Sequence, residues 1–174
     1  MRPDLYWIDN AYGHLAIGPR PKGEEWLADE VRGYRAQGVD TLVSLLTADE
    51  AAELGLAREG VACDASNIAL LNLPIEDRGI PDDGGPVHRF IHDLHRRLES
   101  GERVAIRCRA GIGRSAMVAA SVLTLFGMDA DEAFRRVAAA RGCPVPDTDE
   151  QREWVVRFAA RSGGHDRETR LPGI

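Results

Sequence analysis

Apolar positions along the chain recur with a period of two in some segments and near 3.6 in others, which predicts alternating strands and helices. Leu27, Val31 and Tyr34 recur at helical spacing, and Gly38 follows that helix as a stop signal. This alternation is typical of an α/β domain. The expected strands are 5–8, 15–17, 39–46, 68–75 and 103–107, and the main expected helices are 24–37, 87–98, 114–126, 131–140 and 149–160.

Two connections and the end of the chain complete this pattern. The sequence Thr47-Ala-Asp-Glu50 is a capping box, which predicts a short helix that ends near Leu54. The segment 76–86 holds three Gly, two Pro and three Asp, and polar loops of this length are often functional. A polar tail over 162–174 is expected to follow one domain over 1–161.

Composition narrows the class of protein. A chain of 174 residues with 44% hydrophobic residues has the size of one domain and can bury a core without disulfides or a structural metal. The net charge of -6 argues against a nucleic-acid-binding surface. The longest apolar stretch, 116–126, is shorter than the ~20 residues of a membrane span. An odd number of cysteines, three, and no apolar leader favour a cytoplasmic protein with reduced thiols.

The segment Val104-Ala-Ile-Arg-Cys-Arg-Ala-Gly-Ile-Gly-Arg-Ser115 carries the candidate chemistry. An apolar strand runs into Cys108, and a loop with two glycines leads into a helix that begins at Arg114. Backbone N–H groups of such a loop can converge on one point, and the helix N-terminus adds unpaired N–H groups and a positive dipole end. Arg114 adds a planar fork for two phosphoryl oxygens, so the loop predicts a site for a tetrahedral dianion.

The same positive field acts on the sulfur of Cys108. Helix N-termini and neighbouring cations favour the thiolate form of a cysteine, and the thiolate is the nucleophile. Cys108 is therefore predicted to be an ionised nucleophile at rest. Ser115 directly follows the arginine and can donate its hydroxyl to that sulfur when a thiophosphate breaks down.

The sequence Cys108-Arg-Ala-Gly-Ile-Gly-Arg-Ser115 resembles the signature loop of cysteine-dependent protein tyrosine phosphatases, in the dual-specificity-like branch. Segments 38–46, 73–81 and 146–151 resemble parts of the same branch in the same order. The resemblance implies a single α/β domain with a central, mostly parallel sheet flanked by helices. It also implies hydrolysis of a phosphate monoester on a protein or peptide through a cysteinyl-phosphate intermediate, without metal or cofactor. Arg109, Ala110, Gly111, Ile112 and Gly113 would surround the phosphate.

The leaving oxygen of a phosphate monoester needs a proton, so the mechanism requires a general acid. Asp77 stands 31 residues before Cys108, where the resembling family carries its acid loop. The nearby carboxylates of Glu76, Asp82 and Asp83 are rivals for this role.

Gln151 has two interpretations. It resembles a glutamine that places the attacking water in related phosphatases. Thr148-Asp-Glu-Gln151 is also a capping box that begins the last helix, which would give Gln151 a purely structural role.

One departure from the family pattern is Arg107, which stands where the family usually has histidine before the cysteine. This arginine either supports the thiolate as a nearby cation or points away into solvent. Arg109 is expected to face outward and to attract acidic or additional phosphate groups. Ile112 is apolar where phosphoinositide-preferring relatives often carry lysine, which favours a phosphoprotein substrate over an inositol lipid.

Two other functions remain open at this point. A rhodanese-like sulfurtransferase also mounts a cysteine on an anion-binding loop, and a phosphate-binding module could retain the loop with little turnover. Cys63 and Cys143 could form a reversible disulfide with Cys108. The edge of a soluble helix explains His88, His92 and His95 better than a metal site does.

Overall fold

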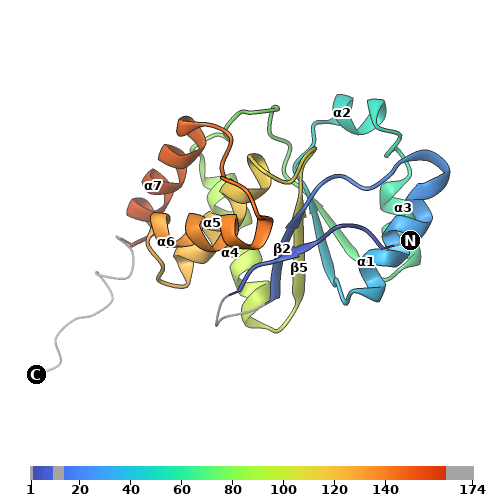
Figure 1. The fold of residues 1–174 in the computed structure, drawn as a ribbon, viewed down its shortest axis with the longest axis horizontal. Helices are drawn as coiled ribbons and strands as arrows, with labels where there is room; N and C mark the ends of the chain where they lie inside the picture. Colours follow the sequence, from blue (N-terminus) through green and yellow to red (C-terminus); the bar gives the residue numbers. More distant parts are fainter. Residues whose placement is uncertain (1, 10–13, 164–174) are drawn as a thin grey trace, which may run out of the picture.

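A five-stranded sheet, in the order β1-β2-β5-β3-β4, forms the centre of the computed structural model, which describes residues 2–9 and 14–163 (Figure 1). β1 is antiparallel to β2, and every other neighbouring pair is parallel, which confirms the expected mostly parallel sheet. The carboxyl ends of the parallel strands therefore meet at one edge. The strands are β1 (Tyr6–Trp7), β2 (His14–Gly18), β3 (Thr41–Ser44), β4 (Ala69–Asn72) and β5 (Arg103–Arg107).

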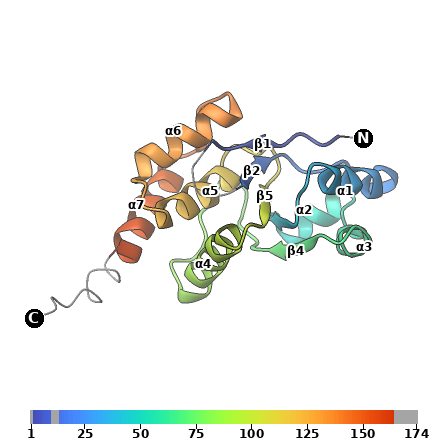
Figure 2. The same cartoon turned by 90° about the horizontal axis from the view of Figure 1, so that it is seen from below.

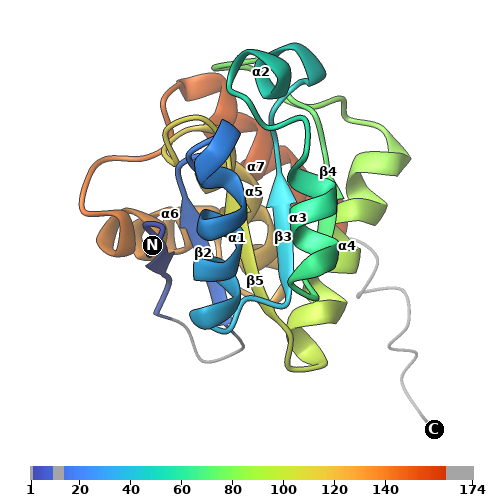
Figure 3. The same cartoon turned by 90° about the vertical axis from the view of Figure 1, so that its right-hand side faces the viewer.

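Helices cover both faces of this sheet (Figures 2 and 3). One face packs against α1 (Leu27–Ala36) and α3 (Glu59–Ala65), and a 3-10 turn, η1 (Glu24–Trp26), precedes α1. The other face packs against α4 (Gly85–Glu99) and α5 (Arg114–Leu125), and α6 (Ala130–Arg141) and α7 (Asp149–Gly163) pack on the far side of α5. The short α2 (Ala48–Glu53) lies beyond the carboxyl end of β3 (Figure 3).

The side chains of β5 separate the two halves of the core. Val104 and Ile106 belong to the cluster on the α5 side, whereas Ala105 belongs to the cluster on the α1 and α3 side. Such alternation is the period of two that a strand covered on both faces requires. α5 is buried from Arg114 to Leu123, so the helix that follows the Cys108 loop is held firmly in the core.

α3 is the element that the hydrophobic pattern does not predict. Glu59 and Cys63 are its buried residues, so the helix buries a carboxylate and a thiol rather than an apolar stripe. The segment expected to be extended over 39–46 forms ladder pairs only at Thr41–Ser44, although Leu45 and Leu46 remain fully buried.

The end of the chain also differs from the expectation. α7 continues to Gly163 and so includes the first two residues of the expected tail, 162 and 163. The remainder of that tail, 164–174, lies outside the described residues. Within 2–9 and 14–163, none of the helices combines the length and apolar character that crossing a membrane requires.

Trp154 provides a test of the packing on the α5 side. Its side chain is fully buried and its ring stacks on Phe158 at 5.5 Å between centroids. We expect Trp154→Ala to lower the free energy of unfolding by about 3–5 kcal/mol, because it leaves a cavity. Val156→Ala is the control on the same helix, since Val156 is 50% exposed, and it should cost less than about 0.5 kcal/mol. Equal losses in urea denaturation would show that α7 is not packed as described.

Candidate active site

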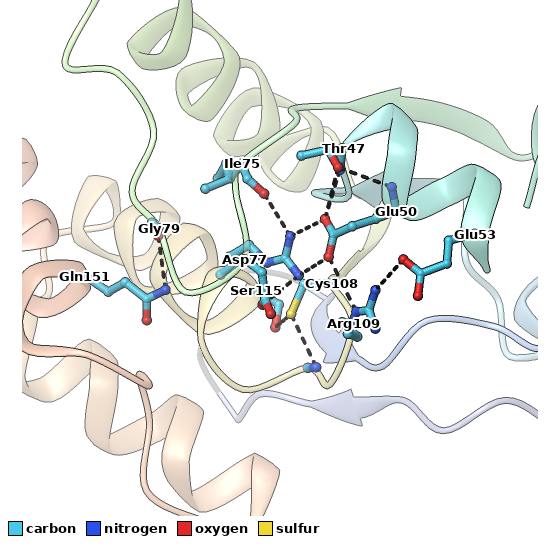
Figure 4. A network of polar contacts seen from close by, with 12 residues as sticks. Thr47, Glu50, Glu53, Ile75, Asp77, Gly79, Cys108, Arg109, Ser115 and Gln151 are labelled. Atoms are coloured by element: carbon cyan, nitrogen blue, oxygen red, sulfur yellow. Dashed lines mark hydrogen bonds and ion pairs between the residues drawn. The ribbon is translucent and has the colours of Figure 1, made fainter.

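Cys108 lies at the carboxyl edge of the sheet, directly after β5, and the loop from Cys108 to Gly113 leads into α5 (Figure 4). Its side chain is 3% exposed. The sulfur accepts a hydrogen bond from the backbone N–H of Gly111 at 3.3 Å, and the thiol donates to the Ser115 hydroxyl oxygen at 3.4 Å. The Gly111 N–H thus points directly at the sulfur, and Ser115 lies within hydrogen-bond distance of it on the first turn of α5.

The loop can take this path because glycine stands at position 111. Gly111 has φ +69°, and a Cβ there would lie 2.5 Å from the carbonyl carbon of Gly18. The loop thus packs directly on the backbone after β2, where Arg20 N–H also bonds Arg109 O at 3.3 Å. A side chain at position 111 would force the loop out of position.

Arg114 is the most constrained charged group of the site. Its side chain is 2% exposed, and both terminal nitrogens contact Glu50, at 2.7 and 3.0 Å. One of these nitrogens also donates to Ile75 O at 2.8 Å, and the other donates to Asp77 at 3.1 Å. Burial alone would lower the pKa of Arg114, but hydrogen bonds to Glu50 and the charges of Cys108 and Asp77 outweigh burial and raise it. The guanidinium is therefore a permanent cation beside the sulfur.

Glu50 is a site residue that sequence reasoning missed. The pattern assigned it only to the capping box, and the structure shows that box: Thr47 bonds Glu50 N–H, and Glu50 bonds Thr47 N–H. The same carboxylate grips Arg114, whose hydrogen bonds lower the pKa of Glu50 to about 2. One signal could have identified Glu50. It follows closely after β3, and the carboxyl ends of parallel strands share the edge of the sheet where Cys108 lies.

Asp77 lies on the loop expected to carry the acid, and its contact with Arg114 brings it to the site. Its side chain is 59% exposed, so the carboxylate also faces solvent. Among its rivals, Asp83 instead lies within 3.7 Å of Arg157 and Arg161 on α7. Glu76 and Asp82 are exposed.

Gln151 connects the loop that carries Asp77 to the start of α7. Its side chain is fully buried, donates to Gly79 O at 3.1 Å and accepts from Asp147 N–H at 3.1 Å. Thr148 caps the Gln151 N–H at 3.2 Å, so the predicted cap is present. The second hydrogen bond of a capping box is absent between these two residues, because the Gln151 side chain accepts from the Asp147 N–H rather than from the Thr148 N–H.

The outward face of the loop is held by Arg141, which the sequence analysis did not identify. Its guanidinium donates to Gly111 O at 3.1 Å and to Ala110 O at 3.3 Å, and it lies over the Tyr6 ring at 4.4 Å. The peptide between Ala110 and Gly111 is thus held at its oxygen by Arg141, while its N–H faces the sulfur. This contact orients the peptide dipole toward Cys108.

The remaining loop residues lie around the edge of the site. Arg109 faces outward as expected, but its guanidinium is already paired with Glu50 at 3.5 Å and with Glu53 at 3.4 Å. Ile112 packs partly against the core on the α5 side. Gly113 is closely approached, since a Cβ there would lie 2.2 Å from an Asp147 oxygen.

Comparison with known proteins gives a family. The family model of the Swiss Army Knife protein, DSP-PTPase phosphatase domain, PTP-SAK, matches residues 5–168. The chain belongs to this family. Among curated proteins, none matches the chain significantly.

Solved structures of phosphatases share the fold. A kinase associated phosphatase with serine in place of its catalytic cysteine is 18% identical, with a TM-score of 0.84 over 95% of this chain and 98% of that one. Tk-PTP in its active form is 26% identical, with a TM-score of 0.66 over 92% and 99%. PTPMT1 is 18% identical, with a TM-score of 0.76 over 95% and 99%. The family model therefore assigns the chain to the cysteine-dependent protein tyrosine phosphatase superfamily rather than to the rhodanese-like sulfurtransferases.

In this DSP-PTPase domain the residue before the cysteine does not point into solvent. Arg107 is 1% exposed and forms an ion pair with Glu59 of α3. The alternative in which it extends into solvent is therefore wrong. Its side chain lies on the opposite face of the sheet from α5.

Cys63 and two of the histidines, His88 and His95, have structural surroundings. Cys63 is fully buried in the cluster on the α1 and α3 side, and burial together with the charge of Glu59 raises its pKa to about 12. Cys108 belongs to the cluster on the other side, so the sheet separates the two thiols. The ring of His88 packs on Phe158 at 4.8 Å, and that of His95 packs on Phe126 at 4.3 Å.

Glu50→Gln tests the contact with Arg114. We expect a loss of about 3 kcal/mol in unfolding free energy at neutral pH, because a buried cation loses its partner. Since the pKa of Glu50 is lowered from 4.5 to about 2, its contribution is present above pH 4.5 and is lost as the pH falls toward 2. Wild type and variant should therefore converge in stability over this window. A difference that is constant from neutral pH to pH 2 would contradict the assignment.

Gly111→Ala tests the close approach to Gly18. Gly101 is the matched control, because its φ is +92° but a Cβ there meets nothing within 4 Å. Gly101→Ala carries only backbone strain, about 1–2 kcal/mol, whereas Gly111→Ala adds a clash and should also lower turnover at least tenfold. Thermal denaturation and phosphatase assays measure both effects. Equal behaviour of the two variants would show that the loop does not rest on the β2 backbone.

Proposed function

We propose that this phosphatase hydrolyses phosphotyrosine, and also phosphoserine and phosphothreonine, through a cysteinyl-phosphate on Cys108. The observation that carries the proposal is the position of Arg114. Its guanidinium is held in the core beside the cysteine loop and reaches Asp77 at 3.1 Å. One cation thus connects the nucleophile and the acid in a single site.

In the first step the Cys108 sulfur attacks phosphorus, and the bond from phosphorus to the leaving oxygen breaks. Asp77 gives its proton to that oxygen, which leaves as an alcohol or phenol. The loop N–H groups, the N-terminus of α5 and Arg114 stabilise the charge on the transferring phosphoryl oxygens.

In the second step water attacks phosphorus, the bond between sulfur and phosphorus breaks, and Asp77 accepts the proton of the water. Ser115 stabilises the departing thiolate through its hydroxyl, which lies 3.4 Å from the sulfur. Gln151 supports this step by holding the acid loop at Gly79 O rather than by a contact with the sulfur.

Substrate binding has to change the contacts of Arg114. Each terminal nitrogen of a guanidinium carries two hydrogens, and here each donates twice. A bound phosphate therefore takes the Nε hydrogen and displaces Asp77 from its terminal nitrogen. That exchange frees the acid for the leaving oxygen, while Glu50 keeps the guanidinium in place.

A phosphorylated protein or peptide is the proposed substrate, and nucleic acids and membranes are not expected partners. Ile112 supports this choice, because an apolar residue in the loop offers no charge to an inositol phosphate. Arg109 is paired with Glu53 and Glu50, so a substrate must compete with these carboxylates for its guanidinium.

The catalytic domain in this proposal comprises residues 1–161, without a metal or cofactor. We also propose a cytoplasmic location. All three cysteines are free, and a thiolate nucleophile requires a reducing compartment to remain active.

An assay with a phosphotyrosine peptide and with an aryl phosphate, at mildly acidic pH with reductant, tests the proposal. Cys108→Ser should abolish turnover, because it removes the nucleophile. Arg114→Ala should reduce kcat/KM by about a thousandfold, because it removes the guanidinium that binds the phosphoryl group. Asp77→Asn should slow the peptide far more than the activated aryl phosphate, which needs little help from an acid.

Asp82→Asn is the matched control for the acid, because Asp82 is an exposed carboxylate of the same loop. It should retain turnover on both substrates. Turnover that survives in Cys108→Ser, or that disappears only when a chelator is added, would overturn the proposed mechanism.

A further inference from the structure

A buried ion pair lies next to the nucleophile in sequence and on the opposite face of the sheet. Arg107 is the last residue of β5 and the neighbour of Cys108, and its guanidinium contacts the Glu59 carboxylate of α3. The two residues are 1% and 6% exposed. Burying both charges costs several kcal/mol per ion, so a pair in this place needs a reason beyond stability.

The backbone around Arg107 is fixed on both sides. Arg107 is in register with Gly18 of β2 and with Ser44 of β3, and its carbonyl accepts from Leu45 N–H at 3.0 Å. Its side chain therefore cannot swing through the sheet to the side of α5. The guanidinium therefore belongs to the residue next to Cys108 in sequence but stays on the opposite face of the sheet from the sulfur.

The carboxylate compensates the charge of Arg107 only in part. Within the described residues, two of the three guanidinium nitrogens, Nε and Nη1, have no hydrogen-bond partner, and neither has one Glu59 oxygen. Glu59 belongs to α3, on the side of Arg107 away from Cys108. The positive end of this pair is thus nearer to the sulfur than the negative end.

Other charged and titratable groups face the pair or the sulfur. On the α1 and α3 side these are Glu30, which accepts from Lys22 N–H at 3.3 Å, the buried Tyr34 and Cys63. Burial raises the pKa of both Tyr34 and Cys63, so these two are neutral at physiological pH. On the side of the sulfur the charged groups are Arg114, Asp77 and Glu50.

We propose that Arg107, oriented by Glu59, is a positioning residue that stabilises the Cys108 thiolate through the sheet. The inference rests on the proposed function, because it concerns the nucleophile of that reaction. Glu59 sets how much of the Arg107 charge the sulfur experiences. α3, which the sequence pattern does not predict, is thereby part of the active site.

The test compares variants that differ in one charge at a time and reads the pH at which half of Cys108 is alkylated by iodoacetamide, measured by mass spectrometry of its peptide. Arg107→Met should raise this midpoint by about one pH unit, because it removes a positive charge that favours the thiolate. Glu59→Gln should lower it by a similar amount. The double variant should lie between them, slightly above wild type.

The opposite directions separate this role from simple structural support, which would move both single variants in the same way or not at all. Arg97→Met, which breaks ion pairs on α4, is the control and should leave the midpoint unchanged. Circular dichroism reports folding. If a single variant does not fold, the double variant Arg107→Met/Glu59→Gln decides, because a neutral pair is tolerated in a core. An alkylation midpoint of the double variant at or below that of wild type overturns the inference.

Alkylation does not depend on turnover, so the outcome is independent of the proposed function. If the wild type hydrolyses a phosphotyrosine peptide but both single variants have the same alkylation midpoint as the wild type, only the role of Arg107 is refuted. Arg107→His should have an alkylation midpoint closer to that of wild type than Arg107→Met has. If the wild type does not hydrolyse the peptide at all, the proposed function is refuted instead.

Discussion

The placement of the Arg114 guanidinium is the constraint on which the rest of the site depends. A permanent cation is buried in a core only if acceptors surround it, and here Glu50, Ile75 O and Asp77 supply them from two different segments. These contacts bring α2 and the acid loop to the cysteine loop. The site is therefore assembled at the carboxyl edge of the sheet by one side chain, and the positive charge that holds it together is also the charge that a phosphate needs.

Around this cation, the peptides of the loop are oriented from outside. Gly111 lets the loop rest on the β2 backbone, and Arg141 holds the carbonyl oxygens of Ala110 and Gly111 away from the sulfur. The N–H of Gly111 then faces Cys108. Preorganised donors of this kind do not need to rearrange when charge develops, which is the main way in which proteins stabilise transferring phosphoryl groups.

Local sequence patterns predicted what short-range physics determines. Most of the order of elements and the loop between β5 and α5 follow from periodicity, capping residues and glycines, whereas the mostly parallel sheet was implied by the family resemblance. Contacts between distant segments could not be read in this way. Glu50 was recognised only as a helix cap, because its bond to Arg114 spans 64 residues. For the same reason Arg141 was missed and the direction of Arg107 was left open. The helix α3 lacks an apolar stripe because it buries Glu59 and Cys63.

The central claim is that the phosphoryl group passes through the Cys108 sulfur within this cradle. Acid quench of the wild-type phosphatase during turnover of a phosphotyrosine peptide, followed by mass spectrometry, tests it most directly. The account predicts a phosphoryl group on the peptide that contains Cys108, present during turnover and absent once substrate is exhausted. Steady turnover with an unmodified Cys108, or with phosphate on another residue, would contradict it.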